Sequence, residues 1–441
     1  MPAGTRLKGA TLKLETYVTM SPSYTIQEPC RRPTRKHLTQ KEFIEFCALC
    51  LFLPPFISTI FSFIKFLNYR NKSTAVLFII FFTLYLSYNF VSVDNSLRFF
   101  SAEKISNYSN WYEGDPLTYL IHLGNQIHIS SSSFFYFFTL TIYLFWYYSY
   151  RNIRKDLKKW DIIILITAVI LRNAIDLSYY TLSLTFLIFY VTRKSHITIK
   201  DYIIITIIIF LLHPGILMVF LPSILLYHIL QNKSTALYYL YLVFLFILTA
   251  NLQNIIPITG ISIIDNIGNA YSHYTSTDNK WGIREDNLSG MTYFIQYYVI
   301  LSLHFIIFIF SVIKRNKIKN KFILSIFQTT MVMLPNFWNY VTITERLMVV
   351  LSLTSILCLI MLQQEYKIQT KYIAYICVFI FGFHTFRASR MDLHGVFYRN
   401  SYQEIQKRSY YIPSILLFNF DTWGYSNEFM NKNSQFKHFL D

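Results

Sequence analysis

Charged residues are scarce in this chain. Only 14% of its 441 residues are Asp, Glu, Lys or Arg, whereas soluble globular proteins carry roughly 25%. So little charge cannot cover a surface that faces water. Glycine and proline are also few, at 12 each. This composition excludes a soluble enzyme, a disordered protein and a disulfide-stapled secreted domain.

Motifs of several common chemistries are missing as well. The chain has no GxxxxGK[ST] or GxGxxG nucleotide motif, no HExxH zinc motif, no DxD pair for a metal-bound nucleotide sugar and no GxSxG nucleophile elbow. Among five cysteines, Cys47 and Cys50 form a CxxC pair, but no second ligand pair accompanies them. We predict buried thiols here, and we expect no metal centre, no ATP hydrolysis and no cofactor.

Long apolar runs dominate what is present. The chain is 54% hydrophobic and contains 41 Phe and 35 Tyr. A helix needs about 20 apolar residues to cross a bilayer, because no water is available there to bind unpaired backbone groups. The sequence predicts an all-α, polytopic integral membrane protein with about 12 transmembrane helices. The expected spans are 43–64, 74–92, 131–149, 160–176, 177–192, 201–213, 215–230, 236–256, 290–313, 322–341, 345–363 and 371–386. The pair 160–176 and 177–192 could also be one long helix.

The positions of the positive charges predict the orientation of these spans. A net charge of +17 would suggest nucleic-acid binding in a soluble protein, but here the charges lie in short clusters between apolar segments. One set of alternate loops holds 19 Lys and Arg residues and the opposite set holds six. Because positive loops stay cytoplasmic, the second set faces outward, and we expect no nucleic-acid partner.

Three regions follow from this pattern: a basic extension over 1–42, a transmembrane helical domain over 43–386 and an aromatic-rich tail over 387–441. The basic extension conflicts with the loop rule, which puts the N-terminus outside. Either Pro54 and Pro55 break the first apolar segment into a re-entrant turn, or the extension includes a non-native start. We see no convincing internal repeat along the chain.

Charged residues beside the outer ends of the spans are the first candidates for function, because a charge at membrane depth is costly unless it is paired or hydrated. Arg98 follows Asp94 by four residues, a spacing typical of a salt bridge within one helix. Arg172 precedes Asp176 by the same spacing, whereas Arg346 adjoins Glu345, which points away from it on a helix. The arginines are either membrane anchors or a pocket for an anionic lipid head group, since a guanidinium binds phosphate with two hydrogen bonds.

A helix break supplies another candidate. His213, Pro214 and Gly215 interrupt an apolar run, and a break at membrane depth leaves polar backbone that must line a cavity or a protein interface. His213 is therefore either a structural residue or part of a site.

Two outer loops, 93–130 and 257–289, are rich in aromatic and polar residues. Aromatic rings beside amides and carboxylates suit sugar faces, although they also populate any membrane interface. Asp115 is either a general base, a ligand of a sugar hydroxyl or a solvated loop charge. The substrate-binding candidates in and beside these loops are Arg98, Trp111, Asp115, Tyr119, Trp281 and Arg284.

Taken together, these features resemble the oligosaccharide repeat-unit polymerases of bacterial surface-polysaccharide pathways, the O-antigen polymerase (Wzy) and EpsG-like group. The resemblance covers roughly residues 74–363. It rests on Asp94-Asn95-Ser96-Leu97-Arg98, on the loop ending in Asp115-Pro116-Leu117-Thr118-Tyr119, on Leu171-Arg172-Asn173-Ala174, on His213-Pro214-Gly215 and on Glu345-Arg346.

The resemblance implies a metal-independent, inverting glycosyltransferase in the bacterial inner membrane. It would transfer a glycan from undecaprenyl pyrophosphate to a sugar hydroxyl on a second lipid-linked oligosaccharide at the periplasmic face. Arg172 and Arg346 would offset the charge on the departing pyrophosphate. His213 or an outer-loop carboxylate would deprotonate the acceptor, with Asp94 and Arg98 in support. Membrane lipid and a chain-length regulator protein are the further partners that such a polymerase implies.

Three other readings stay open. A lipid-linked oligosaccharide flippase or other polysaccharide transporter is the main alternative, because many spans with buried charge also describe transporters. A membrane acyltransferase would need a catalytic histidine, for which the chain offers no clear candidate. A structural subunit is also compatible with the composition.

Overall fold

The computed structural model describes residues 38–89, 116–129, 131–169, 178–194, 196–251, 295–338, 340–394 and 407–418. This part of the chain folds into helices joined by turns, so the predicted all-α class is confirmed. The helices are α1 (Gln40–Phe52), α2 (Pro55–Tyr69), α3 (Lys72–Asn89), α5 (Pro116–Gln126), α6 (Ser131–Ile153), α7 (Lys159–Thr167), α9 (Ser178–Arg193), α10 (Ile199–Leu212), η2 (Pro214–Ile216), α11 (Leu217–Asn232), α12 (Thr235–Ala250), η3 (Ile295–Ile300), α16 (Leu301–Ile313), α17 (Lys321–Met333), η4 (Leu334–Phe337), α18 (Val341–Tyr366), α19 (Thr370–His394) and α21 (Ser414–Leu417).

Helices occupy the predicted apolar segments in whole or in part, with several differences. The expected span 43–64 is two helices, because Pro54 ends α1 and Pro55 opens α2. α5 forms within the region expected to be an outer loop, and α19 continues to His394, beyond residue 386. α7 packs on α19 whereas α9 packs on α6, so these two are separate helices.

Two described helical segments, Pro214–Asn232 and Ile343–Tyr366, are long and apolar enough to cross a membrane. Four shorter apolar helices accompany them, at Lys72–Tyr88, Thr235–Ala250, Tyr298–Ile313 and Thr370–Phe383. Several helices also leave large apolar side chains uncovered. On α12, for example, Leu240, Val243 and Ile247 are each more than half exposed.

α1 and α2 form an antiparallel hairpin. The Ser58 hydroxyl donates to the Cys50 carbonyl at 2.6 Å, and the Lys65 ammonium lies 5.3 Å from the centre of the Phe46 ring. A capping box between Thr39 and Glu42 begins α1. The hairpin therefore returns the chain to the end of the bundle from which α1 started. A break at Pro54 and Pro55 was one of the two alternatives that the sequence left open.

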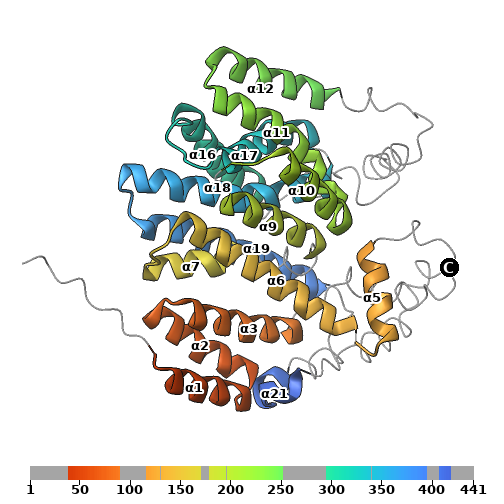
Figure 1. The fold of residues 1–441 in the computed structure, drawn as a ribbon, viewed down its shortest axis with the longest axis vertical. Helices are drawn as coiled ribbons and strands as arrows, with labels where there is room; N and C mark the ends of the chain where they lie inside the picture. Colours follow the sequence, from red (N-terminus) through yellow and green to blue (C-terminus); the bar gives the residue numbers. More distant parts are fainter. Residues whose placement is uncertain are drawn as a thin grey trace, which may run out of the picture. The chain divides into compact units, whose positions relative to one another are not determined.

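Part of the C-terminal region packs on this hairpin and on α3. Ser414 donates to the Leu53 carbonyl through its backbone N–H at 2.9 Å and its hydroxyl at 2.7 Å. The Tyr88 hydroxyl donates to the Leu417 carbonyl at 2.6 Å. Figure 1 shows α21 beside α1. Residues 407–418 are thus part of the folded domain, although they lie in the region expected to be a tail.

The middle of the bundle is α17, which other helices cover on every side. Eleven of its 13 residues are buried, including Gln328 and Thr329. The Gln328 amide donates to the Ser311 hydroxyl of α16 at 3.1 Å. This bond gives the buried Gln328 amide nitrogen a partner inside the bundle.

A network of buried charge joins α6, α7, α18 and α19. Arg154 lies 3.1 Å from the Asp161 carboxylate and donates to Gln363 at 2.7 Å and to Thr370 at 3.3 Å. The Tyr150 hydroxyl donates to the same Asp161 oxygen at 2.6 Å. Because each polar group has a partner, the network holds four helix ends together without leaving a charge unpaired.

The same arrangement recurs 40 residues later. The Tyr190 hydroxyl donates to Asp201 at 2.5 Å, and the Lys194 ammonium lies 3.1 Å from the same carboxylate oxygen. In both copies the backbone N–H three residues before the aspartate binds its second oxygen, at 2.6 Å from Lys158 and 2.8 Å from Thr198.

The two copies also pack together. α6 and α9 lie parallel, because Phe138 contacts Tyr179 at 5.3 Å between ring centres and Phe145 contacts Phe186 at 5.8 Å, both 41 residues apart. α6–α7 and α9–α10 are therefore an internal repeat, so the expectation of no repeat was wrong. We call the end of the bundle that holds Asp161 and Asp201 the aspartate end.

Three helices stop at this end on a basic residue in the left-handed backbone conformation: Arg70 after α2 (φ 52°), Lys233 after α11 (φ 56°) and Lys367 after α18 (φ 54°). Glycine is the usual residue at such a position. A cation there instead interacts favourably with the negative end of the helix dipole.

We predict different stabilities for two repeat-related substitutions. Arg154→Ala leaves a buried carboxylate without its cation and should destabilise the protein by about 3–5 kcal/mol. Lys194→Ala removes a cation whose side chain is 45% exposed, so its cost should be about 0–1 kcal/mol. Thermal unfolding of the purified proteins, followed by loss of the monodisperse size-exclusion peak, measures both. Equal midpoints for the two variants would contradict the assignment of Arg154 to a buried network.

Candidate functional site

The break after α10 positions His213. The helix ends at Leu212, and His213 takes an extended backbone conformation before Pro214 opens the short helix η2. The His213 N–H still donates to the Ile209 carbonyl at 2.7 Å. Pro214 has no backbone N–H to donate, so the series of helix hydrogen bonds ends at His213. The His213 imidazole takes the place of a backbone carbonyl as acceptor, because the Gly215 N–H donates to Nδ1 of His213 at 3.1 Å.

Glycine at position 215 leaves room for the imidazole in this position. A Cβ atom there would lie 2.9 Å from Cε1 and 3.0 Å from Nδ1 of His213, so the ring would have to shift. The bond also selects the tautomer. Since Nδ1 accepts a hydrogen bond, the proton of the neutral ring is on Nε2. His213 therefore presents Nε2 as a donor.

Tyr180 connects His213 to Arg346. It lies in the first turn of α9, is 2% exposed and stands perpendicular to the His213 ring, with 5.2 Å between ring centres and 86° between planes. The Arg346 guanidinium carbon lies 6.0 Å from the centre of the same ring, within the range of a cation–π contact. One buried ring thus gathers residues from α9, α10 and α18.

Arg346 is held by the start of α18. The Thr344 hydroxyl donates to the Phe337 carbonyl at 2.6 Å, which ties the first turn of α18 to η4. Arg346 and Glu345 are both half-buried. The fixed turn sets the direction in which the guanidinium leaves the helix.

Tyr180, His213 and Arg346 form what we call the histidine-end cluster. α9 runs from Tyr180 to Tyr190, and α10 runs from Asp201 to His213, so the cluster and the aspartate networks occupy opposite ends of the same helices. The cluster can offer a guanidinium and an imidazole N–H to an anion, and phosphate oxygens accept from both donors.

The structure describes three of the ten predicted site residues. It brings His213 and Arg346 together through Tyr180. Tyr119 lies on α5, is 38% exposed and has its ring 6.1 Å from that of His122; α5 in turn packs on α10. The remaining seven lie outside the described residues: Asp94, Arg98, Trp111, Asp115, Arg172, Trp281 and Arg284.

Tyr180 was missed by sequence reasoning. It is one tyrosine among 35, and it begins a helix with no charge or break to mark it. Its closeness to the pair Arg172 and Asp176 along the chain is the signal that could have drawn attention to it.

The structure also describes four of the cysteines and the possible metal ligands. Cys47 is half-buried and Cys50, Cys358 and Cys377 are buried, all as free thiols. Within the described ranges, no group of three or more His, Cys, Asp or Glu side chains is arranged to hold a metal ion.

Comparison with family models, with curated proteins and with solved structures finds no match to this chain.

We predict that Gly215→Ala displaces the His213 ring, because its Cβ would meet the imidazole. The loss of the bond to Nδ1 should release the tautomer preference. Nitrogen NMR of histidine-labelled protein, with the His213 signals assigned from a His213→Gln variant, follows this change. An unaltered pair of ring nitrogen shifts in the alanine variant would show that the contact does not restrain the ring.

Proposed function

We propose that the helices form a multi-pass domain in the bacterial inner membrane. Exposed apolar side chains on α10, α12 and α16 support this, including Ile207, Phe244 and Phe305, since a soluble surface rarely carries such continuous apolar patches. The charge asymmetry of 19 to six between alternate loops supports the same placement.

The aspartate end then faces the cytoplasm. Arg70, Lys233 and Lys367 terminate helices there, and the predicted positive loops belong to that end. The hairpin of α1 and α2 removes the conflict over the N-terminus, because Lys41 and Lys65 come to the same end as Arg70. By this orientation the histidine-end cluster lies toward the periplasmic side.

We propose that the cluster is part of the active site of an oligosaccharide repeat-unit polymerase. The observation that carries the proposal is the meeting of Arg346 and His213 at one buried ring, Tyr180, at the predicted outer end. These residues come from distant parts of the chain, and their convergence is what an anion-binding site needs.

In the proposed reaction, an acceptor sugar hydroxyl attacks the anomeric carbon of the donor glycan. The new glycosidic bond forms as the bond to undecaprenyl pyrophosphate breaks, with inversion at that carbon. Arg346, aided by Arg172, offsets the charge that develops on the departing pyrophosphate. The proposal needs no metal or cofactor.

The proton of the acceptor goes to a carboxylate in this proposal. Nδ1 of His213 is occupied by the Gly215 N–H, so the neutral ring is a donor rather than a base. This favours an outer-loop carboxylate, Asp94 or Asp115, as the general base, and gives His213 the task of donating to a phosphate oxygen.

The acceptor and donor are undecaprenyl pyrophosphate-linked oligosaccharides. We propose that Trp111, Tyr119 and Trp281 stack on their sugar rings and that Arg98, Asp115 and Arg284 bind polar groups. The exposed position of Tyr119 on α5 supports such a role. A chain-length regulator protein is the expected protein partner.

The internal repeat favours a second candidate, a lipid-linked oligosaccharide flippase or other polysaccharide transporter. Parallel repeats are a feature of several transporter folds, and α6–α7 and α9–α10 are related in this way. The repeat here covers two neighbouring hairpins rather than two halves of the chain, so we place the polymerase first.

We predict that Arg346→Ala shortens the polysaccharide in the native host. The loss of one donor to a developing charge lowers a rate by about 10²–10³, and Arg346→Lys should also fail because an ammonium cannot form the two-pronged bond. Silver-stained gels should show single repeat units in place of a ladder, as they should for Arg172→Ala and for deletion of the gene.

Arg315→Lys is the matched control. Arg315 lies near the aspartate end, where it donates to Thr235 at 2.8 Å, so its variant should keep the ladder. All variants must accumulate in the membrane to the same level. Normal ladders from both Arg172→Ala and Arg346→Ala would remove the site assignment, and loss of every repeat on deletion would point to export.

A further inference from the structure

Three cations gather at the aspartate end, where α11 meets α12 and α16 meets α17. Lys233 ends α11, and two residues later Thr235 begins α12. The Arg315 guanidinium donates to the Thr235 hydroxyl at 2.8 Å, and the Lys321 ammonium donates to the Arg315 carbonyl at 2.5 Å. These contacts bring cations from separate parts of the chain together. We call Lys233, Arg315 and Lys321 the basic cluster.

The basic cluster carries positive charge that no carboxylate of the described residues offsets. Within that part of the chain, none of its three members forms an ion pair. Burial and then the charges of Arg315 and Lys233 lower the pKa of Lys321 to about 8. Like charges held close together repel each other. An anion bound among them would remove this repulsion, so the cluster has the charge of an anion site.

Arg315 is already committed to the fold. Its guanidinium carbon lies 4.8 Å from the centre of the Tyr238 ring and 5.7 Å from that of Tyr239, within the range of cation–π contacts. With the bond to Thr235, these contacts hold the turn before α17 against α12. The two lysines of the cluster remain as donors for a ligand, because each ammonium has three N–H groups.

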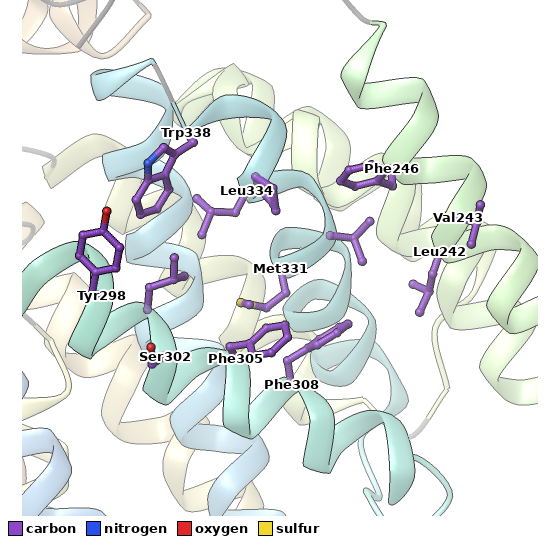
Figure 2. Close-up of a pocket in the computed structure, with 13 residues that line it drawn as sticks. Leu242, Val243, Phe246, Tyr298, Ser302, Phe305, Phe308, Met331, Leu334 and Trp338 are labelled. Carbon is purple, nitrogen blue, oxygen red and sulfur yellow. The ribbon is translucent and has the colours of Figure 1, made fainter. Parts of the chain in front are cut away.

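An apolar groove of about 760 Å³ lies between α12, α16 and α17. Figure 2 shows Tyr298 and Trp338 at one end, Leu242 and Val243 of α12 at the other, and Met331 between them. Most of the side chains that line it are aliphatic or aromatic. Such a lining suits hydrocarbon.

The α12 end of the groove adjoins the basic cluster. Tyr238 and Tyr239, which contact Arg315, lie one helical turn before Leu242 and Val243 on the same face of α12. Tyr239 and Val243 are 47% and 57% exposed, so this face is open along that turn. A rise of about 5.4 Å therefore separates the groove from the rings that the guanidinium contacts.

We infer that Lys233 and Lys321 bind the phosphate of an anionic phospholipid whose acyl chain lies in this groove. Basic pockets at the cytoplasmic ends of membrane helices bind such head groups, and the aspartate end is the proposed cytoplasmic end. A zwitterionic lipid brings its own cation to the cluster, and a free phosphate makes no use of the groove. The inference rests on the membrane placement proposed above and does not need the polymerase reaction.

Photocrosslinking in mixed vesicles tests this inference. Val243 lines the groove and is 57% exposed, whereas Leu240 is 66% exposed and lies outside the lining. Each is replaced by p-benzoylphenylalanine in the full chain, in vesicles of equal parts phosphatidylglycerol and phosphatidylcholine. After irradiation, mass spectrometry measures the ratio of the two lipids in the adducts. We expect phosphatidylglycerol to be enriched about tenfold at position 243 and not at 240.

Two charge variants and a matched control accompany the labelling at 243. Lys321→Gln and Lys233→Gln each remove one proposed phosphate ligand and should lower the enrichment to about twofold. Lys317→Gln removes an exposed charge from the turn between α16 and α17 and should leave the enrichment unchanged. All of them must give the same monodisperse size-exclusion peak, and either lysine variant alone is sufficient for the test.

Equal enrichment at 243 and 240 would show only a general attraction of anionic lipid to a basic surface, and would overturn the inference. A loss in Lys317→Gln as large as that in Lys321→Gln would do the same. Inorganic phosphate added in excess should not change the ratio. If it removes the enrichment, the cluster binds a free anion and the inference is wrong.

The outcome is separate from that of the proposed function. Selective labelling at 243 in a chain that joins no repeat units would retain the phospholipid site and reject the polymerase. Polymerisation by a chain without selective labelling at 243 would reject the phospholipid site alone.

Discussion

The hydrogen bond from the Gly215 backbone to His213 determines how the rest of the candidate site is placed. It replaces a helix hydrogen bond that Pro214 removes, and it holds the imidazole perpendicular to the Tyr180 ring. Tyr180 in turn presents a ring face to Arg346. The end of α10 thus lies beside side chains of α9 and α18, and the imidazole gives the Gly215 N–H a hydrogen-bond partner.

The charged groups at the two ends of the bundle have different surroundings. At the aspartate end, Asp161 and Asp201 each bind a tyrosine, a cation and a backbone N–H, so their charges serve the structure. At the histidine end, Tyr180 packs against both the His213 ring and the Arg346 guanidinium. The networks of the first end stabilise the fold, and the second end is where we propose the chemistry.

Composition and hydropathy were sufficient to predict the helical class and the position of most helices. Pro54 and Pro55 indicated the break that forms the hairpin as one of two alternatives, because proline acts through local sterics and the loss of a donor. The helix α5 was not predicted, since its 11 residues are too few to cross a bilayer and the expected helices were membrane spans. It packs on α6 and α10.

The candidate site was predictable only in part. His213 was marked by its helix break and Arg346 by its charge, but their meeting depends on Tyr180, which has neither mark. The repeat escaped notice for a similar reason. Both copies pair a tyrosine and a cation with an aspartate, as Tyr150 and Asp161 do in the first copy. The cation is Arg154 in the first copy and Lys194 in the second. The repeat is therefore visible in the contacts between neighbouring helices and not as a run of identical residues in the sequence.

The most direct test of the account is an electron cryo-microscopy structure of the protein in a lipid nanodisc with undecaprenyl pyrophosphate. We predict density for the diphosphate within hydrogen-bonding distance of the Arg346 guanidinium, beside Tyr180 and His213. Diphosphate density at the aspartate end, or a bound lipid whose head group lies away from Arg346, would contradict the claim that this cluster holds the leaving group.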